Sequence, residues 1–172
     1  MNNKKALVVI DMQNDYLWND RKSMFSYDTD TLVDSVNTII HDFSQHGNDV
    51  IYIGQIFPDI ITNKWFIGFS IKNTPGAEIF SGVDIVSDFY FEKNLPDTFT
   101  SRKFKEFVAL KQYDEVTLCG LDLCGCVGAT AKGAVKNGIK VKIAEMATGC
   151  RFDNKKICKQ KGDLLSLGVE FI

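Results

Sequence analysis

The chain has 172 residues, of which 45% are hydrophobic and 24% charged, and this composition predicts one globular domain spanning residues 1–172 rather than a disordered or low-complexity protein. Twenty basic and 22 acidic side chains give a formal net charge of −2, which argues against nucleic acid and anionic membranes as partners. No apolar stretch is long enough for a signal sequence or a membrane span, so we expect a cytoplasmic protein.

The N-terminal part of the chain alternates strand, helix and strand. Ala6–Ile10 is an unbroken apolar run ended by Asp11, as in a strand that is buried on both faces of a parallel sheet. Thr31–His46 has apolar residues at helical spacing and is followed by Gly47, a residue type that often ends helices. Val50–Ile53 is the second expected strand.

The segment Ile56–Gly82 has neither a helix period nor a strand period. It contains several aromatic residues and a Thr74-Pro75-Gly76 turn, and loops of this length in compact domains are usually functional. We therefore expect this segment to form a wall of a binding site. The residues Asp84–Glu92 are expected to include a strand, in which the aromatic side chains at positions 89–91 alternate between the two faces.

The C-terminal part repeats the alternation of helix and strand. The expected elements are helix Ser101–Gln112, strand Val116–Cys119, helix Gly125–Asn137, strand Lys140–Ile143, helix Lys155–Leu167 and strand Val169–Ile172. Gly138 and Gly168 follow the last two helices, where glycine commonly ends a helix. Strands that alternate with helices predict a mostly parallel sheet covered on both faces, that is, a three-layer α/β/α sandwich.

Polar residues directly after the strands are the candidates for chemistry, because ligands of parallel α/β sheets bind beyond the carboxyl ends of the strands. Asp11, Lys93 and Cys126 occupy such positions. A carboxylate base, a thiol nucleophile and a cation that stabilises the thiolate would together form a hydrolase site. Each residue alone also fits a structural role, namely a turn cap, a surface lysine and a buried thiol.

Cys126 is expected to be reactive because of its position at the start of a helix. Unpaired N–H groups and the helix dipole lower the pKa of a thiol there, and the same N–H groups can stabilise an oxyanion. Cys124 lies two residues before Cys126, so the two cysteines could alternatively form a redox pair or a thiolate metal site. A second pair of ligands at the spacing of zinc sites is missing from the sequence. The cysteines are interpreted as thiols rather than a disulfide framework; they are Cys119, Cys124, Cys126, Cys150 and Cys158.

Four motifs in this order resemble the isochorismatase-like cysteine hydrolase superfamily, which includes nicotinamidases, N-carbamoylsarcosine amidases and isochorismatases. They are Ala6–Asp15, Thr74–Ile79, Phe91–Lys93 and the segment from Gly120 to Ala131. The resemblance implies a catalytic triad of Asp11, Lys93 and Cys126. It also implies a small-molecule substrate, no cofactor, and assembly into a homodimer or a higher homo-oligomer, for which the many aromatic residues supply apolar surface.

The resemblance implies further residues around this triad. It aligns the Asp122–Leu123 bond with a cis peptide that helps to form the oxyanion hole of the family. We expect Gln13, Trp65 and Cys124 to contribute to the substrate pocket, with core packing as an equal alternative for Trp65.

A metal is not expected in this site. Metal-dependent nicotinamidases use an aspartate and two histidines of the central loop. The histidines of this chain, His41 and His46, lie instead in the first expected helix.

The nucleophile narrows the reaction. Isochorismatases split a vinyl ether without a cysteine nucleophile, so the presence of Cys126 favours attack on an acyl carbon. We predict a cofactor-free cysteine amidohydrolase that cleaves an amide or carbamoyl C–N bond of a small molecule through a thioester intermediate. The alternatives are an isochorismatase-type ether hydrolase and a catalytically idle binding protein of the same fold, with Cys124 and Cys126 as a thiol switch.

Overall fold

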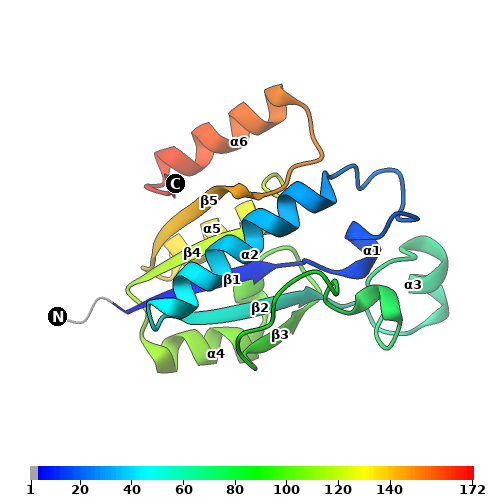
Figure 1. The fold of residues 1–172 in the computed structure, drawn as a ribbon, viewed down its shortest axis with the longest axis horizontal. Coiled ribbons are helices and arrows are strands. Elements are labelled where there is room, and N and C mark those ends of the chain that lie inside the picture. Colours follow the sequence, from blue (N-terminus) through cyan, green and yellow to red (C-terminus); the bar gives the residue numbers. More distant parts are fainter. Residues whose placement is uncertain (1–3) are drawn as a thin grey trace.

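A six-stranded sheet runs through the centre of the molecule (Figure 1), and every neighbouring pair of strands in it is parallel. The computed structural model describes residues 4–172. The strands are, in chain order, β1 (Lys5–Ile10), β2 (Asp49–Gln55), β3 (Tyr90–Lys93), β4 (Glu115–Gly120), β5 (Lys140–Thr148) and β6 (Glu170–Phe171). They lie in the order β3-β2-β1-β4-β5-β6, which confirms the predicted parallel sheet.

Helices cover both faces of this sheet. The α-helices are α1 (Asn14–Leu17), α2 (Thr29–Gln45), α3 (Ile61–Phe66), α4 (Arg102–Lys111), α5 (Cys126–Lys136) and α6 (Asn154–Ser166). Apolar side chains of α1 and α2 form a core on one face, and those of α4, α5 and α6 form a core on the other. The two cores confirm the three-layer α/β/α sandwich.

The central strand β1 explains the unbroken apolar run near the N-terminus. Leu7 and Val9 enter the core beneath α2, whereas Val8 and Ile10 enter the opposite core. Because helices cover both faces of the sheet, every position of this strand favours an apolar side chain.

Each predicted helix begins and ends within two residues of the corresponding observed helix. The residues that cap the helices explain these bounds. The side chains of Asp28 and Asp153 accept hydrogen bonds from the first turns of α2 and α6, which places both starts slightly before the predicted ones. Gly47, Gly138 and Gly168 have φ angles of 72°, 77° and 82°, the left-handed conformation that glycine adopts readily after a helix.

Two predicted regions differ from the structure. The strand expected within Asp84–Glu92 is restricted to β3, because the carbonyl oxygen of Asp84 accepts a hydrogen bond from Tyr52 Oη at 2.7 Å and the chain joins the sheet only later. The segment Ile56–Gly82 is not wholly irregular, since it contains α3 and a 3-10 turn at Pro75–Ala77.

The order of the strands creates a switch point at the carboxyl ends of β1 and β4. The chain proceeds outward from β1 to β3 and then returns to the other side of β1 to form β4. Gly120, the last residue of β4, has a φ of 99°, and a Cβ atom there would collide with the backbone of Ile10. Leu121 N donates to Ile10 O at 2.8 Å, so the two strand ends lie close together at the place where such sheets bind ligands.

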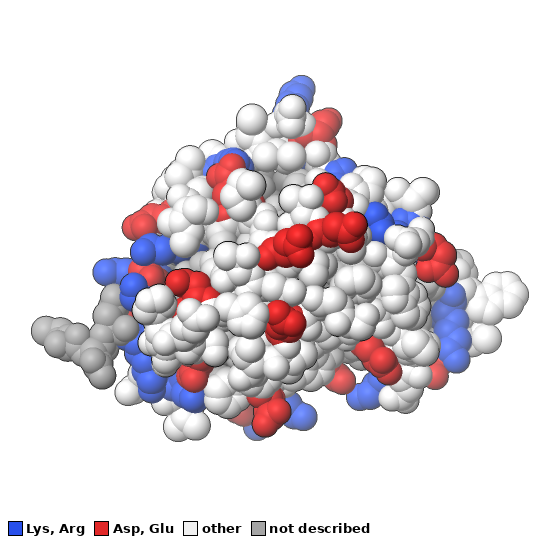
Figure 2. Space-filling model, in the orientation of Figure 1, with Lys and Arg blue, Asp and Glu red and all other residues white. Residues whose placement is uncertain are grey.

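The surface of the described part of the chain is mixed in charge. On the face shown in Figure 2, acidic and basic side chains occur among a larger uncharged area, without a continuous basic region. Within residues 4–172 there is no helix of the length and apolar character needed to cross a membrane.

Candidate active site

Asp11, Lys93 and Cys126 come together beyond the carboxyl ends of the strands. Asp11 follows β1, Lys93 is the last residue of β3, and Cys126 is the first residue of α5, which follows β4. Lys93 Nζ donates to Asp11 Oδ2 at 2.9 Å and to Gln55 Oε1 at 2.7 Å. The Cys126 thiol interacts with both Asp11 and Lys93. Three polar residues that the sequence singled out therefore form one cluster.

Asp11 is held in an uncommon backbone conformation with one free carboxylate oxygen. Its φ of 54° lies in the left-handed region, which non-glycine residues rarely adopt. Where such residues do adopt it, they are often at functional sites. The side chain is buried, and Oδ1 has no hydrogen-bond partner among residues 4–172, whereas Oδ2 is paired with Lys93. This arrangement leaves one buried oxygen able to accept a proton.

Lys93 carries a positive charge inside the protein. Burial lowers the pKa of this lysine, but the Asp11 carboxylate and the Cys126 thiol raise it by more, so the pKa lies above its usual value. The ammonium group is therefore charged at neutral pH and supplies a fixed positive charge between the carboxylate and the thiol.

The Cys126 thiol is held in its neutral form, contrary to the expectation from its helix position. Burial raises its pKa most, the Asp11 carboxylate raises it further, and Lys93 lowers it only in part, so that the pKa is raised to about 12. The helix N-terminus lies at the thiol as predicted, but its effect is outweighed by loss of water and by the nearby carboxylate. Proton removal thus has to accompany nucleophilic attack.

Iodoacetamide is expected to label Cys126 slowly at neutral pH, because only the thiolate reacts and the raised pKa keeps the thiolate rare. Asp11→Asn removes a charge that raises this pKa, so labelling should accelerate by about tenfold for each unit by which the pKa falls. Time-resolved peptide mapping would measure both rates, with the exposed Cys158 as internal control. Wild-type Cys126 reacting faster than Cys158 at pH 7 would contradict the raised pKa.

A cavity of about 200 Å³ opens at this cluster, smaller than the pockets of about 300–1,000 Å³ that hold drug-sized ligands, so it suits a small molecule. Five aromatic residues contribute to its walls, namely Tyr16, Phe25, Tyr27, Phe57 and Phe69. Two of these, Phe57 and Phe69, belong to the segment Ile56–Gly82, which the sequence predicted to line a binding site. The polar lining includes the catalytic candidates Asp11 and Cys126 together with Gln55, Asn94, Asp122 and Arg151.

Two tyrosine hydroxyls at the cavity keep their protons. The pKa of Tyr16 is raised first by burial and then by Asp11, and the pKa of Tyr27 is raised first by burial and then by Asp122. Tyr27 Oη donates to Asp122 Oδ2 at 2.9 Å, whereas Tyr16 Oη accepts from Ser70 Oγ at 2.8 Å. The Tyr16 proton is thus available to an acceptor in the cavity.

The turn between β4 and α5 differs in detail from the sequence expectation. The cis peptide bond joins Leu121 and Asp122, one bond earlier than the predicted Asp122–Leu123 bond. Leu123 N donates to Gly149 O at 3.0 Å, which fixes this residue in the turn and makes its N–H unavailable to an oxyanion. Within residues 4–172, in contrast, the backbone N–H groups of Asp122 and Cys126 have no acceptor.

The three residues predicted to complete the substrate pocket lie outside its lining. Trp65 is 81% exposed on α3, where its side chain points away from the core. Gln13 is fully buried and clamps the end of β2, because its Oε1 accepts from Gln55 N at 2.8 Å and its Nε2 donates to Gln55 O at 3.1 Å. Cys124 does not reach the cavity, since its thiol lies beside Cys150.

Gln55 is a site residue that the sequence reasoning missed. It is the last residue of β2 and accepts from Lys93, and its buried Nε2 has no acceptor among the described residues. The rule that selected Asp11, a polar residue at the carboxyl end of a strand, would have selected Gln55 as well. Arg151 and Phe25 gave no comparable signal, because loop folding alone brings them to the cavity.

The residues around the cavity do not suit a catalytic metal ion. Its lining contains two carboxylates, and Asp11 is already paired with Lys93, while both oxygens of Asp122 accept hydrogen bonds. His41 lies on α2 and His46 directly follows it, and their imidazoles contact Asp84 and Asp42 respectively. Zinc and related metals prefer several nitrogen or thiolate ligands that converge on one point, and this cavity lacks them.

The parallel sheet and the cluster of Asp11, Lys93 and Cys126 place this chain in a class of proteins. These are three-layer α/β proteins with an aspartate, a lysine and a cysteine grouped beyond the carboxyl ends of their strands. The sequence model of the isochorismatase domain matches residues 5–156. The chain therefore belongs to the isochorismatase family.

Known relatives agree with this assignment. An uncharacterized isochorismatase family protein of Bacillus subtilis strain 168, YddQ, is 25% identical over 143 residues, which span 83% of this chain and 76% of the relative. The fold is shared with N-carbamoylsarcosine amidase from Thermoplasma acidophilum, at 24% identity and a TM-score of 0.82, covering 98% of this chain and 95% of the other. It is also shared with pyrazinamidase of Pyrococcus horikoshii in complex with zinc, at 22% identity and a TM-score of 0.85, covering 98% of both chains.

Proposed function

We propose that this protein is a cysteine amidohydrolase, which cleaves an amide or carbamoyl C–N bond of a small molecule through a thioester intermediate. The observation that carries the proposal is the cluster of Cys126 and Asp11, which line the cavity, with the buried Lys93 paired to Asp11. A thiol, a buried carboxylate oxygen without a partner and a fixed cation are the groups that acyl transfer requires. The amidases among the structural neighbours are consistent with this reaction.

The first half of the reaction begins with the neutral thiol. Asp11 Oδ1 takes the proton from Cys126 as Sγ attacks the substrate carbonyl carbon, and Lys93 offsets the negative charge that develops on sulfur. The protonated Asp11 then returns the proton to the leaving nitrogen as the C–N bond breaks. The products of this half are an amine or ammonia and a thioester on Cys126.

The second half repeats the same roles with water. Asp11 removes a proton from a water molecule that attacks the thioester carbonyl. The C–S bond then breaks to release the acid, and Asp11 returns its proton to the departing sulfur, which regenerates the thiol and the carboxylate. We assign the oxyanion hole of both halves to the backbone N–H groups of Asp122 and Cys126, because both lack an acceptor within the described residues.

The cavity suits a small substrate with a flat, apolar body. Five aromatic side chains line it, and aromatic rings stack well on planar groups. Gln55 Nε2 and the Tyr16 hydroxyl are buried donors that face the polar end, and Arg151 adds a cation at the cavity. We therefore favour amides of small planar compounds, including those that carry a negative charge opposite Arg151.

A panel of primary amides and carbamoyl compounds, assayed for ammonia release, tests this function. Aromatic amides should be hydrolysed in preference to aliphatic amides of the same size. Release of product from vinyl ethers without any amide turnover would instead support the isochorismatase-type ether hydrolase. A protein that turns over neither class, but binds aromatic acids or amides, would support the catalytically idle alternative.

Homo-oligomer formation is also a proposal. Ile60, Ile61, Trp65 and Phe66, at and before α3, are between 51% and 87% exposed, a concentration of apolar surface that a second copy of the chain could cover. Sedimentation velocity should give at least a dimer at micromolar concentration. Trp65→Glu combined with Phe66→Glu should shift the protein toward monomer, while a sedimenting monomer of the wild-type protein would refute assembly. The cytoplasmic location stays a prediction from the sequence.

A further inference from the structure

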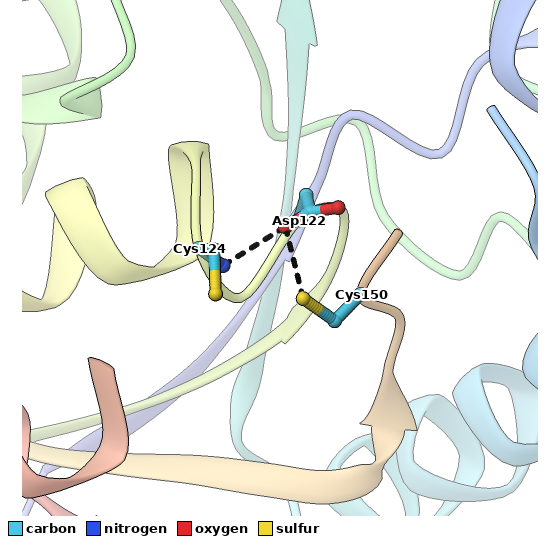
Figure 3. Close-up of side chains that lie close together, drawn as sticks. All are labelled: Asp122, Cys124 and Cys150. Carbon is cyan, nitrogen blue, oxygen red and sulfur yellow. Dashed lines mark hydrogen bonds between the residues drawn. The ribbon is translucent and has the colours of Figure 1, made fainter. Parts of the chain in front are cut away.

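A second group of reactive side chains lies close together in Figure 3, and one of its members, Asp122, also lines the main cavity. Asp122 sits in the turn before α5, Cys124 follows it in the same turn, and Cys150 follows β5. One ligand atom from each, a carboxylate oxygen and two Sγ atoms, lies within 4.8 Å of the others. The thiols of Cys124 and Cys150 also interact directly with each other.

Asp122 holds the two cysteine segments together. Its Oδ1 accepts from Cys124 N at 2.8 Å and from Cys150 Sγ at 3.5 Å. Its Oδ2 accepts from Tyr27 Oη and from Arg151 N, each at 2.9 Å. This buried carboxylate therefore fixes the backbone on both sides of the thiol pair, which keeps the two sulfur atoms near each other without a covalent bond.

We propose that Cys124 and Cys150 form a redox site that closes reversibly into a disulfide. The two thiols are close, both are partly accessible, and both belong to turns outside regular helices and strands. The site lies beyond the hydrolase reaction, because its chemistry uses neither Asp11 nor Cys126. It also replaces the Cys124–Cys126 pair suggested by the sequence, since the Cys126 thiol interacts with Asp11 and Lys93 instead.

The remaining cysteines are less suited to a disulfide. Cys119 is fully buried in β4, and burial raises its pKa. Cys158 is exposed on α6 and is not a member of the group formed by Asp122, Cys124 and Cys150. The turn that carries Cys124 and the segment after β5 that carries Cys150 are further joined by the bond from Leu123 N to Gly149 O at 3.0 Å. The pair thus spans two segments that already lie together.

A metal ion explains this group less well than a dithiol does. Structural zinc sites have four protein ligands. Among the described residues this group supplies three, namely Asp122, Cys124 and Cys150. Both oxygens of Asp122 are already acceptors of hydrogen bonds that hold the turn, so a metal would have to displace them.

The oxidation balances with a low-molecular-weight disulfide, such as oxidised glutathione, as the oxidant. The Cys150 thiolate attacks one sulfur of this disulfide, giving a mixed disulfide and one released thiolate. Cys124 then loses its proton to solvent and attacks the Cys150 sulfur, forming the Cys124–Cys150 bond and releasing the second thiolate. Two protein thiols are oxidised, and one small disulfide is reduced to two small thiols.

Closure of the disulfide would change the hydrogen bonds at the cavity wall. Cys150 Sγ would no longer donate to Asp122 Oδ1, although the contact from Cys124 N would remain. Asp122 and Arg151 both line the main cavity. Oxidation of Cys124 and Cys150 would therefore alter the hydrogen bonds that hold this part of the cavity wall.

The test is incubation of the reduced full-length protein with a graded series of oxidised and reduced glutathione, followed by acid quenching and peptide mapping. We expect a Cys124–Cys150 crosslink that forms at oxidising ratios and disappears completely with dithiothreitol. Cys150→Ser and Cys124→Ser should each abolish the crosslink, whereas Cys158→Ser, which alters an exposed thiol elsewhere, should leave it unchanged.

Several results would overturn the proposal. These are a Cys124–Cys126 crosslink in the wild-type protein, a glutathione adduct on Cys150 that never resolves to a disulfide, and zinc bound stoichiometrically to the purified protein and released by either serine variant. Peptide mapping of the wild-type protein, together with a measurement of its zinc content, decides between these outcomes, so the test holds even if a serine variant folds poorly.

Discussion

Replacing Cys126 with serine is expected to lower the turnover of any amide substrate by at least about a thousandfold. An alcohol is far less acidic than a thiol, and the Asp11 carboxylate is too weak a base to remove its proton during attack. Cys126→Ala should remove the covalent step altogether and still bind substrate, because the aromatic walls of the cavity are unchanged. Steady-state ammonia release and equilibrium binding would measure the two effects separately.

The control for this prediction is Cys158→Ser, which replaces an exposed thiol of α6 and should retain full activity. Since Asp11 and Cys126 act in one step, Asp11→Asn combined with Cys126→Ala should be no less active than Cys126→Ala alone. Wild-type turnover in Cys126→Ala would exclude the covalent mechanism and leave the ether-hydrolase reading in its place.

Lys93→Met is expected to lower the free energy of unfolding by about 3–5 kcal/mol. Lys93 and Asp11 are only 4% and 3% exposed, and their side chains form an ion pair at 2.9 Å. Removing the lysine leaves the Asp11 carboxylate buried without its cation. The free-energy cost of this unpaired buried charge is larger than the net stabilisation that the ion pair provides. The sequence placed both residues at the ends of strands, and the structure shows that they are buried there. Urea unfolding at neutral pH would measure the change.

Two further variants make this measurement decisive. Asp11→Asn combined with Lys93→Met removes both charges and should recover most of the lost stability, although activity should remain absent. Lys72→Met breaks an exposed ion pair with Glu92 and should change stability by less than about 1 kcal/mol. Equal effects of the two lysine substitutions would show that Asp11 is hydrated and that the Lys93 ion pair is not buried in solution.

These two experiments separate catalysis from folding at the same residues. Asp11→Asn is expected to be both unstable and inactive, because Lys93 then loses its buried counter-charge, whereas Cys126→Ala should be inactive and close to wild type in stability. Activity data for Asp11 and Lys93 variants therefore need the unfolding data beside them, while Cys126 variants report on the chemistry alone.

The sequence by itself determined the architecture and the three central residues of the candidate site. Apolar runs such as Ala6–Ile10 are visible because strands buried on both faces need apolar side chains at each position. Helix spacing and the glycines after α2, α5 and α6 are equally local signals. Asp11, Lys93 and Cys126 followed from one rule, that polar groups after parallel strands meet at one edge of the sheet.

Only the tertiary structure decided the properties that depend on neighbours distant in the sequence. The neutral state of Cys126 results from burial and from Asp11, which follows β1 and is distant from Cys126 in the sequence. Trp65 and Gln13 could not be assigned from spacing, because a surface helix and a buried clamp can carry the same residue types as a pocket wall. The pairing of Cys124 with Cys150 depends on how the turn before α5 meets the end of β5. Sequence patterns record the period of a helix or strand, whereas loop packing fixes which side chains meet in space.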